Sequence, residues 1–158
     1  MKILVTFFLV SLLSISTYSA YAQGPKVLVV TAHPDDETMF PATIFKITRE
    51  LKGTVDLALI TDASGGYNGL VASTYYNKSL TDSATGRAVL PLLRKKELLC
   101  AGEVMGIRNF FFFDQLDDFY QIDPTPFFEG KRWDMAFCEK KLNKILEEGQ
   151  YDFVFCLV

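Results

Sequence analysis

The sequence predicts an α/β fold, a three-layer α/β/α sandwich built around a mostly parallel sheet. Four short apolar runs, rich in β-branched or aromatic residues, alternate along the chain with three stretches of helical periodicity. This alternation is typical of parallel βαβ units, whose crossover connections are right-handed. The first run, Val27-Leu28-Val29-Val30, is apolar without interruption. Such a run suits a strand in a sheet that helices cover on both faces.

The predicted elements follow one another from residue 26 onward. Strands are expected at residues 26–31, 55–61, 109–113 and 151–157, and helices at residues 37–51, 92–105 and 131–147. Pro91 suits the first turn of the second helix, where a missing N–H costs nothing. In the third helix Trp133, Phe137 and Ile145 are interspersed with lysines and glutamates. That pattern predicts an amphipathic helix with one face on the sheet.

Two connections are long and irregular. Residues 62–87 are rich in Gly, Ser, Asn and Thr, and residues 114–130 contain Pro124 and Pro126. Long loops in compact domains are often binding loops. Both loops follow a predicted strand, which places them at the carboxyl edge of the sheet, where open α/β proteins bind ligands. We therefore expect the functional site at that edge.

The first 22 residues have the layout of a secretory signal peptide. Lys2 gives a positive start, residues 3–13 are almost wholly apolar, and Ala20-Tyr21-Ala22 has the small-x-small form of a cleavage site. The alternative is an N-terminal membrane anchor, but the apolar run is shorter than the roughly 20 residues that span a bilayer. Cleavage after Ala22 leaves residues 23–158 as one domain, secreted or periplasmic, with no stable membrane span.

Composition narrows the class of partner. The formal net charge is −3 and the basic residues form no stripe, which argues against nucleic acid. The three cysteines, Cys100, Cys138 and Cys156, are an odd number and favour buried free thiols over a disulfide. The last predicted strand runs to the end of the sequence, from which we expect a domain truncated at its C-terminus.

A group of residues suited to metal chemistry follows the first strand, in the order Ala32-His33-Pro34-Asp35-Asp36-Glu37. Zinc accepts histidine together with carboxylate in an open catalytic site. If the turn directs His33 and Asp36 to one point, Asp35 can take a proton from an adjacent water molecule. The alternative is structural: an aspartate caps the next helix and His33 is a hydrogen-bonded turn residue. Other divalent metals would also accept this pair of ligands.

Residues 26–37 resemble the opening of the LmbE-like, or PIG-L, family of zinc-dependent N-deacetylases. The resemblance implies a Rossmann-like α/β sandwich and the removal of acyl groups, usually acetyl, from amino-sugar conjugates such as N-acetylglucosaminyl compounds. It implies that His33 and Asp36 bind Zn²⁺ and that Asp35 is the general base. The implied partner is therefore a small-molecule amino sugar.

Further segments are similar to the same family. Residues 59–66 resemble its strand and glycine loop, although Ala63 stands where glycine is common, and Arg94-Lys95-Lys96-Glu97 resembles its Arg-x-x-Glu helix. The segment from Phe113 to Asp118 resembles the one that follows the third strand. The resemblance implies that Arg94 and Asp117 bind substrate. The alternatives are a solvated helix face with an Arg94–Glu97 ion pair and a plain loop acid. We expect the neighbouring glycines to serve backbone geometry.

The chain departs from the family pattern in having only one histidine. The family takes its third zinc ligand from a His-x-x-His segment that this sequence lacks, and catalytic zinc typically has three protein donors. Two hypotheses therefore stay open: a zinc-dependent hydrolase of N-acetylated amino sugars, and a non-catalytic carbohydrate-binding protein of the same fold. A nucleotide-binding module is disfavoured because the first turn lacks the glycine fingerprint.

Overall fold

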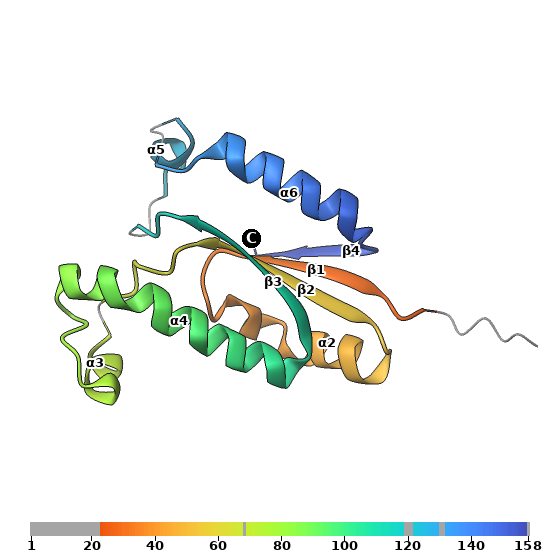
Figure 1. The fold of residues 1–158 in the computed structure, drawn as a ribbon, viewed down its shortest axis with the longest axis horizontal. Helices are drawn as coiled ribbons and strands as arrows, with labels where there is room; N and C mark the ends of the chain where they lie inside the picture. Colours follow the sequence, from red (N-terminus) through yellow and green to blue (C-terminus); the bar gives the residue numbers. More distant parts are fainter. Residues whose placement is uncertain (1–22, 68, 119–121, 130–131, 158) are drawn as a thin grey trace, which may run out of the picture.

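The computed structural model describes residues 23–67, 69–118, 122–129 and 132–157. Within these residues a parallel sheet has the strand order β3-β2-β1-β4 (Figure 1). The strands are β1 Lys26–Thr31, β2 Thr54–Thr61, β3 Ile107–Gln115 and β4 Phe153–Cys156. Each pair of neighbours runs parallel. With helices on both faces of the sheet, the predicted α/β fold class is confirmed.

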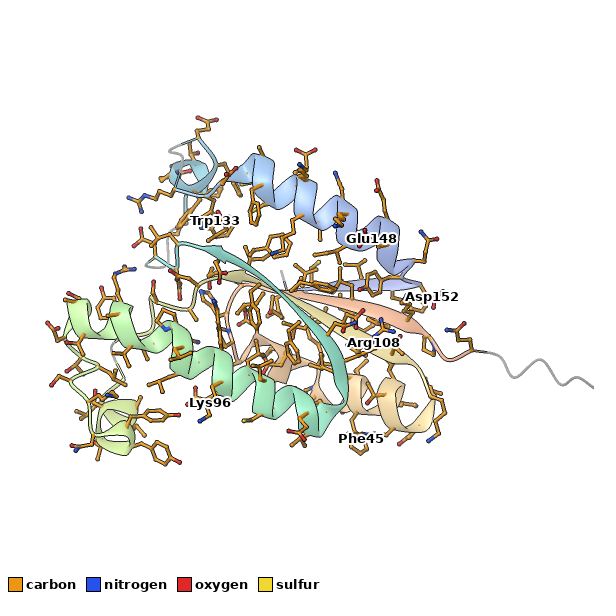
Figure 2. The ribbon with its side chains drawn as sticks, viewed as in Figure 1. Phe45, Lys96, Arg108, Trp133, Glu148 and Asp152 are labelled. Carbon is orange, nitrogen blue, oxygen red and sulfur yellow. The ribbon has the colours of Figure 1, made fainter. Side chains whose placement is uncertain are left out.

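Side chains alternate between the two faces of the sheet, and the two central strands, β1 and β2, are buried on both faces. On one face lie α2 Pro41–Phe45 and α4 Ser83–Met105, and on the other lies α6 Met135–Gly149 (Figure 1). The first face buries Val27, Val29, Val55, Leu57, Leu59, Ile44 and Leu98. The second buries Leu28, Ala58, Phe113 and Ile145. The outward-pointing Lys96 and Glu148 of the two helical layers are exposed (Figure 2).

The predicted helix over residues 37–51 is wrong as a single element. The structure has a 3-10 turn, η2 Asp36–Met39, then α2, then a π-helical turn, η3 Lys46–Glu50. Pro41 is the cause at the first break, since proline has no N–H to donate to the preceding turn. The chain closes that turn with Phe40 N–H donating to the Glu37 carbonyl at 3.0 Å.

The second predicted helix begins earlier than expected. α4 starts at Ser83, where the Asp82 side chain accepts a hydrogen bond from Thr85 N–H, so Pro91 lies inside the helix and not in its first turn. The N-capping residue Asp82 marks the start of this helix more accurately than Pro91 does. The preceding loop also contains a short helix, α3 Leu70–Tyr76.

The remaining bounds differ in detail. The third strand is longer than predicted and the fourth is shorter. A short helix, α5 Thr125–Phe128, lies in the second long loop, and α6 starts at Met135, after its N-cap residue.

The cysteines are free, but their predicted burial is wrong, because Cys100 and Cys156 are exposed and Cys138 is half-buried. Cys156 is exposed because β4 is the edge strand of the described sheet.

The predicted signal peptide, residues 1–22, lies outside the described residues, and the secreted or periplasmic location stays a prediction. Among the helices that are described, none is both long and apolar enough to cross a membrane.

We predict that Gly86→Ala destabilises the fold. A Cβ at Gly86 would lie 2.2 Å from Tyr67 Cβ and 2.9 Å from the Leu80 carbonyl oxygen, both in the core beside α4. The overlap costs roughly 1–3 kcal/mol, which exceeds the gain of at most about 1 kcal/mol from alanine's helix propensity. Urea unfolding measures the difference. Gly69→Ala is the control, since its Cβ meets Ala72 at an ordinary 3.5 Å. Equal stabilities of the two variants would contradict the prediction.

Candidate active site

The turn after β1 lies where the strand order reverses. β2 and β3 succeed one another on one side of β1, whereas β4 lies on its other side. Open α/β sheets bind ligands at the carboxyl ends of the strands near such a switch point. β1 ends at Thr31, and His33, Pro34 and Asp35 follow after one intervening residue, Ala32. The predicted position of the site, at this edge of the sheet, therefore agrees with the topology.

Two carboxylates fix the backbone of this turn. Asp36 Oδ2 accepts hydrogen bonds from Ala32 N–H at 3.0 Å and from His33 N–H at 2.8 Å. Glu37 is buried and its Oε2 accepts the Asp35 N–H at 2.9 Å, while burial raises the pKa of the Glu37 carboxyl. These bonds hold Asp35 at φ 114°, a strained conformation for a residue with a side chain. The strain is consistent with a turn whose shape serves the site.

The Asp35 side chain forms no helix cap, so the structural alternative for this residue is wrong. Its carboxylate is 74% exposed, and its Oδ1 lies 3.5 Å from Arg94 Nη2. Asp35 thus presents an accessible carboxylate oxygen near His33, which is the requirement for a base that takes a proton from water.

His33 is oriented by Asp117. His33 Nε2 lies 3.1 Å from Asp117 Oδ1, and Asp117 Oδ2 accepts the Gly65 N–H at 2.9 Å. The hydrogen bond with Asp117 raises the pKa of His33, against the effect of its partial burial. Burial acts to raise the pKa of Asp117, but the hydrogen bonds from His33 and Gly65 outweigh it and the pKa is lowered. Asp117 is therefore an ionised, buried partner of His33 and no plain loop acid.

Arg94 reaches the site from the middle of α4. Its side chain is only 18% exposed, Nη2 donates to the Pro34 carbonyl at 2.9 Å, and Nη1 lies 3.8 Å from Asp117 Oδ2. The alternative of a solvated helix face is wrong for Arg94. Glu97 accepts a hydrogen bond from Tyr76 instead of forming the ion pair with Arg94 that belonged to this alternative.

The glycine loop is shaped by this cluster. A Cβ at Gly65 would lie 2.7 Å from Asp117 Cγ, and one at Gly66 would lie 3.1 Å from Arg94 Nη1. Both glycines let the loop approach the buried charges closely. The prediction that they serve backbone geometry fits these contacts.

Sequence reasoning missed Arg87. Its Nη1 donates to the Asp117 carbonyl at 2.9 Å and to Ser64 Oγ at 3.2 Å, and its Nη2 lies 3.7 Å from Asp118. Arg87 joins the two long loops at the site. The Asp82 capping signal would have placed this residue on a helix, but only the fold brings it to residues 64 and 117.

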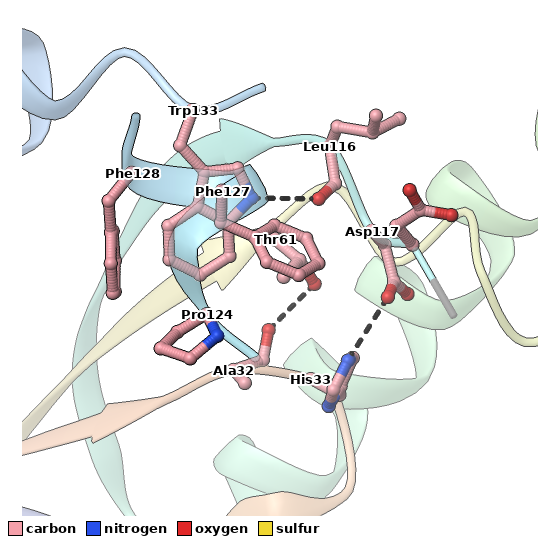
Figure 3. A pocket seen from close by; sticks show the side chains of 10 residues that line it. Ala32, His33, Thr61, Leu116, Asp117, Pro124, Phe127, Phe128 and Trp133 are labelled. Carbon is pink, nitrogen blue, oxygen red and sulfur yellow. Dashed lines mark hydrogen bonds and ion pairs between the residues drawn. The ribbon is translucent and has the colours of Figure 1, made fainter. Parts of the chain in front are cut away.

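Two cavities open at the site and share His33, Asp117 and Asp118. The polar one has a volume of about 360 Å³ and is also lined by Asp35, Arg94 and the two glycines of the loop. The other has a volume of about 220 Å³. Its wall contains Pro124, Phe127, Phe128 and Trp133 (Figure 3). The aromatic wall is the second feature that the sequence did not reveal.

The expected metal ligands lie together but supply two donors. His33 Nδ1 is 3.7 Å from Asp36 Oδ2, close to the separation of roughly 3.3 Å that two tetrahedral zinc ligands have. The hydrogen bond of Nε2 with Asp117 leaves Nδ1 as the ring atom for a metal, as in carboxylate–histidine–zinc triads. In the described part of the chain, no group of three histidine, cysteine, aspartate or glutamate side chains could hold a metal ion. The pair thus fits two of the usual three positions.

The comparisons with known proteins agree with this geometry. The family model described as GlcNAc-PI de-N-acetylase, PIG-L, matches residues 28–158. The chain belongs to the PIG-L family, as the turn after β1 predicted. A search of curated proteins gave no significant match.

Several solved structures share the fold. N,N'-diacetylchitobiose deacetylase from Pyrococcus horikoshii is 21% identical with a TM-score of 0.59, and the match covers 98% of this chain and 48% of that one. A deacetylase of teicoplanin biosynthesis is 14% identical with a TM-score of 0.57, covering 84% and 57%. The 4-carboxy-2-hydroxymuconate hydratase of Pseudomonas putida is 22% identical with a TM-score of 0.50, covering 82% and 45%. The chain thus spans about half the length of these proteins, and the fold alone does not choose between hydrolysis and hydration.

Proposed function

We propose that the protein is a metal-dependent hydrolase that removes the acetyl group from an N-acetylated amino sugar or its conjugate. One observation carries the proposal: the turn after β1 brings together an accessible carboxylate, Asp35, and a pair of possible metal ligands, His33 and Asp36. Membership of the PIG-L family supports an amide as the substrate bond. The exposed side of the turn opens into the polar cavity, where a sugar amide can reach it.

In this mechanism Asp35 takes the proton of the attacking water and passes it to the leaving amine. Arg94 Nη2 lies 3.5 Å from Asp35 Oδ1, and both side chains line the polar cavity. His33 and Asp36 would hold Zn²⁺, which when bound supplies Lewis acidity toward water and the amide carbonyl. Another divalent metal would be held by the same atoms.

In this proposal the sugar binds in the polar cavity. Arg94 has guanidinium N–H groups beside Asp35 and Gly66, and the loop backbone is open to the same space. Sugar hydroxyls find donors and acceptors there. We assign Arg94 to substrate binding, and Asp117 both to substrate binding and to positioning His33.

The second candidate is a carbohydrate-binding protein without catalysis. It is favoured by one observation, that the described residues offer only two metal donors. The two candidates differ in metal dependence and turnover, and not in the sugar they bind.

The test is acetate release from N-acetylglucosamine conjugates by the complete product of the gene. We expect turnover that a chelator abolishes and that added Zn²⁺ restores, because the hydrolysis depends on the metal. Sugar binding without acetate release would support the second candidate. Turnover at an unchanged rate after full chelation would contradict the assignment of His33 and Asp36.

We predict that Asp117→Ala lowers zinc affinity by roughly 10- to 100-fold, because it removes the carboxylate that orients His33. Competition with a chromophoric chelator measures the affinity. Asp114→Ala is the matched control: it lies three residues earlier, is exposed and pairs with Lys95. Equal zinc affinity of Asp117→Ala and the wild type, with the fold intact, would show that His33 needs no such support.

A further inference from the structure

The smaller cavity beside His33 has a chemical character of its own. Trp133 lies in its wall, with its ring centroid 5.5 Å from that of Phe127 and 6.3 Å from that of Phe128, both pairs at steep interplanar angles. Pro124 extends this wall, and Ala32 and His33 lie across from it (Figure 3). The aromatic wall is supplied by α5 and by the segment just before α6.

The side-chain polar atoms of Trp133, Thr61 and Asp118, which line this cavity, already have partners. Trp133 Nε1 donates to the Leu116 carbonyl at 2.9 Å, and Thr61 Oγ1 donates to the Ala32 carbonyl at 2.7 Å. The Asp118 carboxylate pairs with Arg87 and Arg132. A sugar ring placed here would give up hydrogen bonds with water and gain few in return, which is unfavourable. An apolar group of a few carbon atoms loses nothing by entering and gains from burial.

Two compartments that differ in polarity therefore meet at His33. The polar cavity contains Asp35, Arg94 and the glycine loop, and the apolar cavity contains the aromatic wall. An amide carbon attacked beside Asp35 has, besides its carbonyl oxygen, two substituents, the amine nitrogen of the sugar and the acyl chain. With the sugar in the polar cavity, the acyl chain points past His33 into the apolar one.

We propose that the aromatic cavity binds the acyl chain, so that the protein accepts, besides N-acetyl compounds, N-acyl amino sugars whose acyl group is longer than acetyl, and binds them more tightly. This inference rests on the proposed hydrolase function. The volume of about 220 Å³ is below that of pockets for drug-sized ligands, roughly 300–1,000 Å³. A short or medium chain fits this space better than a second sugar conjugate.

Trp133 is the only tryptophan of the chain, so its fluorescence reports directly on this cavity. The probes are N-acetylglucosamine, N-octanoylglucosamine and octyl glucoside, the last two titrated below their critical micelle concentrations. Each buried methylene raises affinity roughly three- to fourfold. We therefore expect N-octanoylglucosamine to bind at least tenfold more tightly than N-acetylglucosamine. Equal affinities would overturn the proposal. Octyl glucoside binding as tightly as N-octanoylglucosamine would also overturn it, since the apolar group would then be an O-linked one.

A matched pair of variants tests the wall. Phe128 is 48% exposed and lines the cavity, whereas Phe45 is 47% exposed and lies on α2, outside it. We expect Phe128→Ala to reduce the preference for the octanoyl compound at least fivefold, Phe128→Leu to retain most of it, and Phe45→Ala to leave it unchanged. An unchanged preference in Phe128→Ala would contradict the assignment of the wall.

Binding and turnover separate the two proposals. Fluorescence titration requires neither metal nor hydrolysis. Acetate release without preferential octanoyl binding would refute the acyl-chain inference and leave the hydrolase function standing. Preferential octanoyl binding without hydrolysis of any N-acyl sugar would refute the hydrolase function and identify the cavity as an acyl-sugar binding site.

Discussion

Replacing Asp35 with asparagine is expected to lower the rate of acetate release by roughly 10²- to 10⁴-fold, the usual contribution of a general base. The amide has the shape of the carboxylate but cannot accept a proton at neutral pH. Asparagine also tolerates a positive φ better than most residues, so the turn at φ 114° should keep its form. We therefore expect the loss in kcat, with zinc affinity and the free energy of unfolding close to those of the wild type.

The matched control for this experiment is Asp114→Asn. Asp114 is also exposed, also has a positive φ, and pairs with Lys95, the residue next to Arg94 on α4. It does not line either cavity of the site. The control variant should keep full activity. If Asp35→Asn kept more than a tenth of the wild-type rate, another group would have to be the base.

The parallel sheet could be predicted because local signals agree with it. Each strand is a short apolar run, and burial on both faces explains why Val27 to Val30 are all apolar. Helix bounds were harder, because Pro91 is compatible with a helix start and also lies inside α4. The exposure of Cys156 could not be inferred either, since an apolar run does not reveal that its strand is at an edge.

The site was predictable only where its residues are adjacent in sequence. His33, Asp35 and Asp36 stand in one turn, and the hydrogen bonds to Asp36 Oδ2 are local. Asp117 is 84 residues from His33, and its buried position became visible only once β1 and β3 were placed in one sheet. The aromatic wall has no local signature, because its phenylalanines and tryptophan are also typical of a core.

At the opposite end of the sheet, Asp56 is expected to control acid stability. It is buried in β2, and its carboxylate accepts hydrogen bonds from Arg108 Nε at 3.0 Å and Nη2 at 2.6 Å, Asn109 Nδ2 at 3.0 Å and Tyr151 Oη at 2.6 Å. It thus ties β2 to β3 and to the residue that leads into β4. Breaking a buried pair costs about 3–5 kcal/mol, and Arg108 is exposed enough to regain water. We expect Asp56→Ala to lose about 3 kcal/mol, or about 10 °C in Tm.

The pH dependence of this loss distinguishes a charge effect from a packing effect. Burial acts to raise the pKa of Asp56, but the hydrogen bonds from Arg108 and Tyr151 outweigh it, so the pKa lies below its ordinary value. Because the pKa of Asp56 is lower in the folded state, its ionisation stabilises the fold at pH values above the unfolded-state pKa of about 3.9. This contribution is lost as the pH falls through the pKa of the folded state. In urea unfolding, the stability difference between wild type and Asp56→Asn should therefore be constant near neutral pH and shrink below about pH 4. Tyr151→Phe, which removes one hydrogen bond and no charge, should cost only about 1 kcal/mol. A difference that stays constant down to the acid limit would assign the role of Asp56 to its shape and not to its charge.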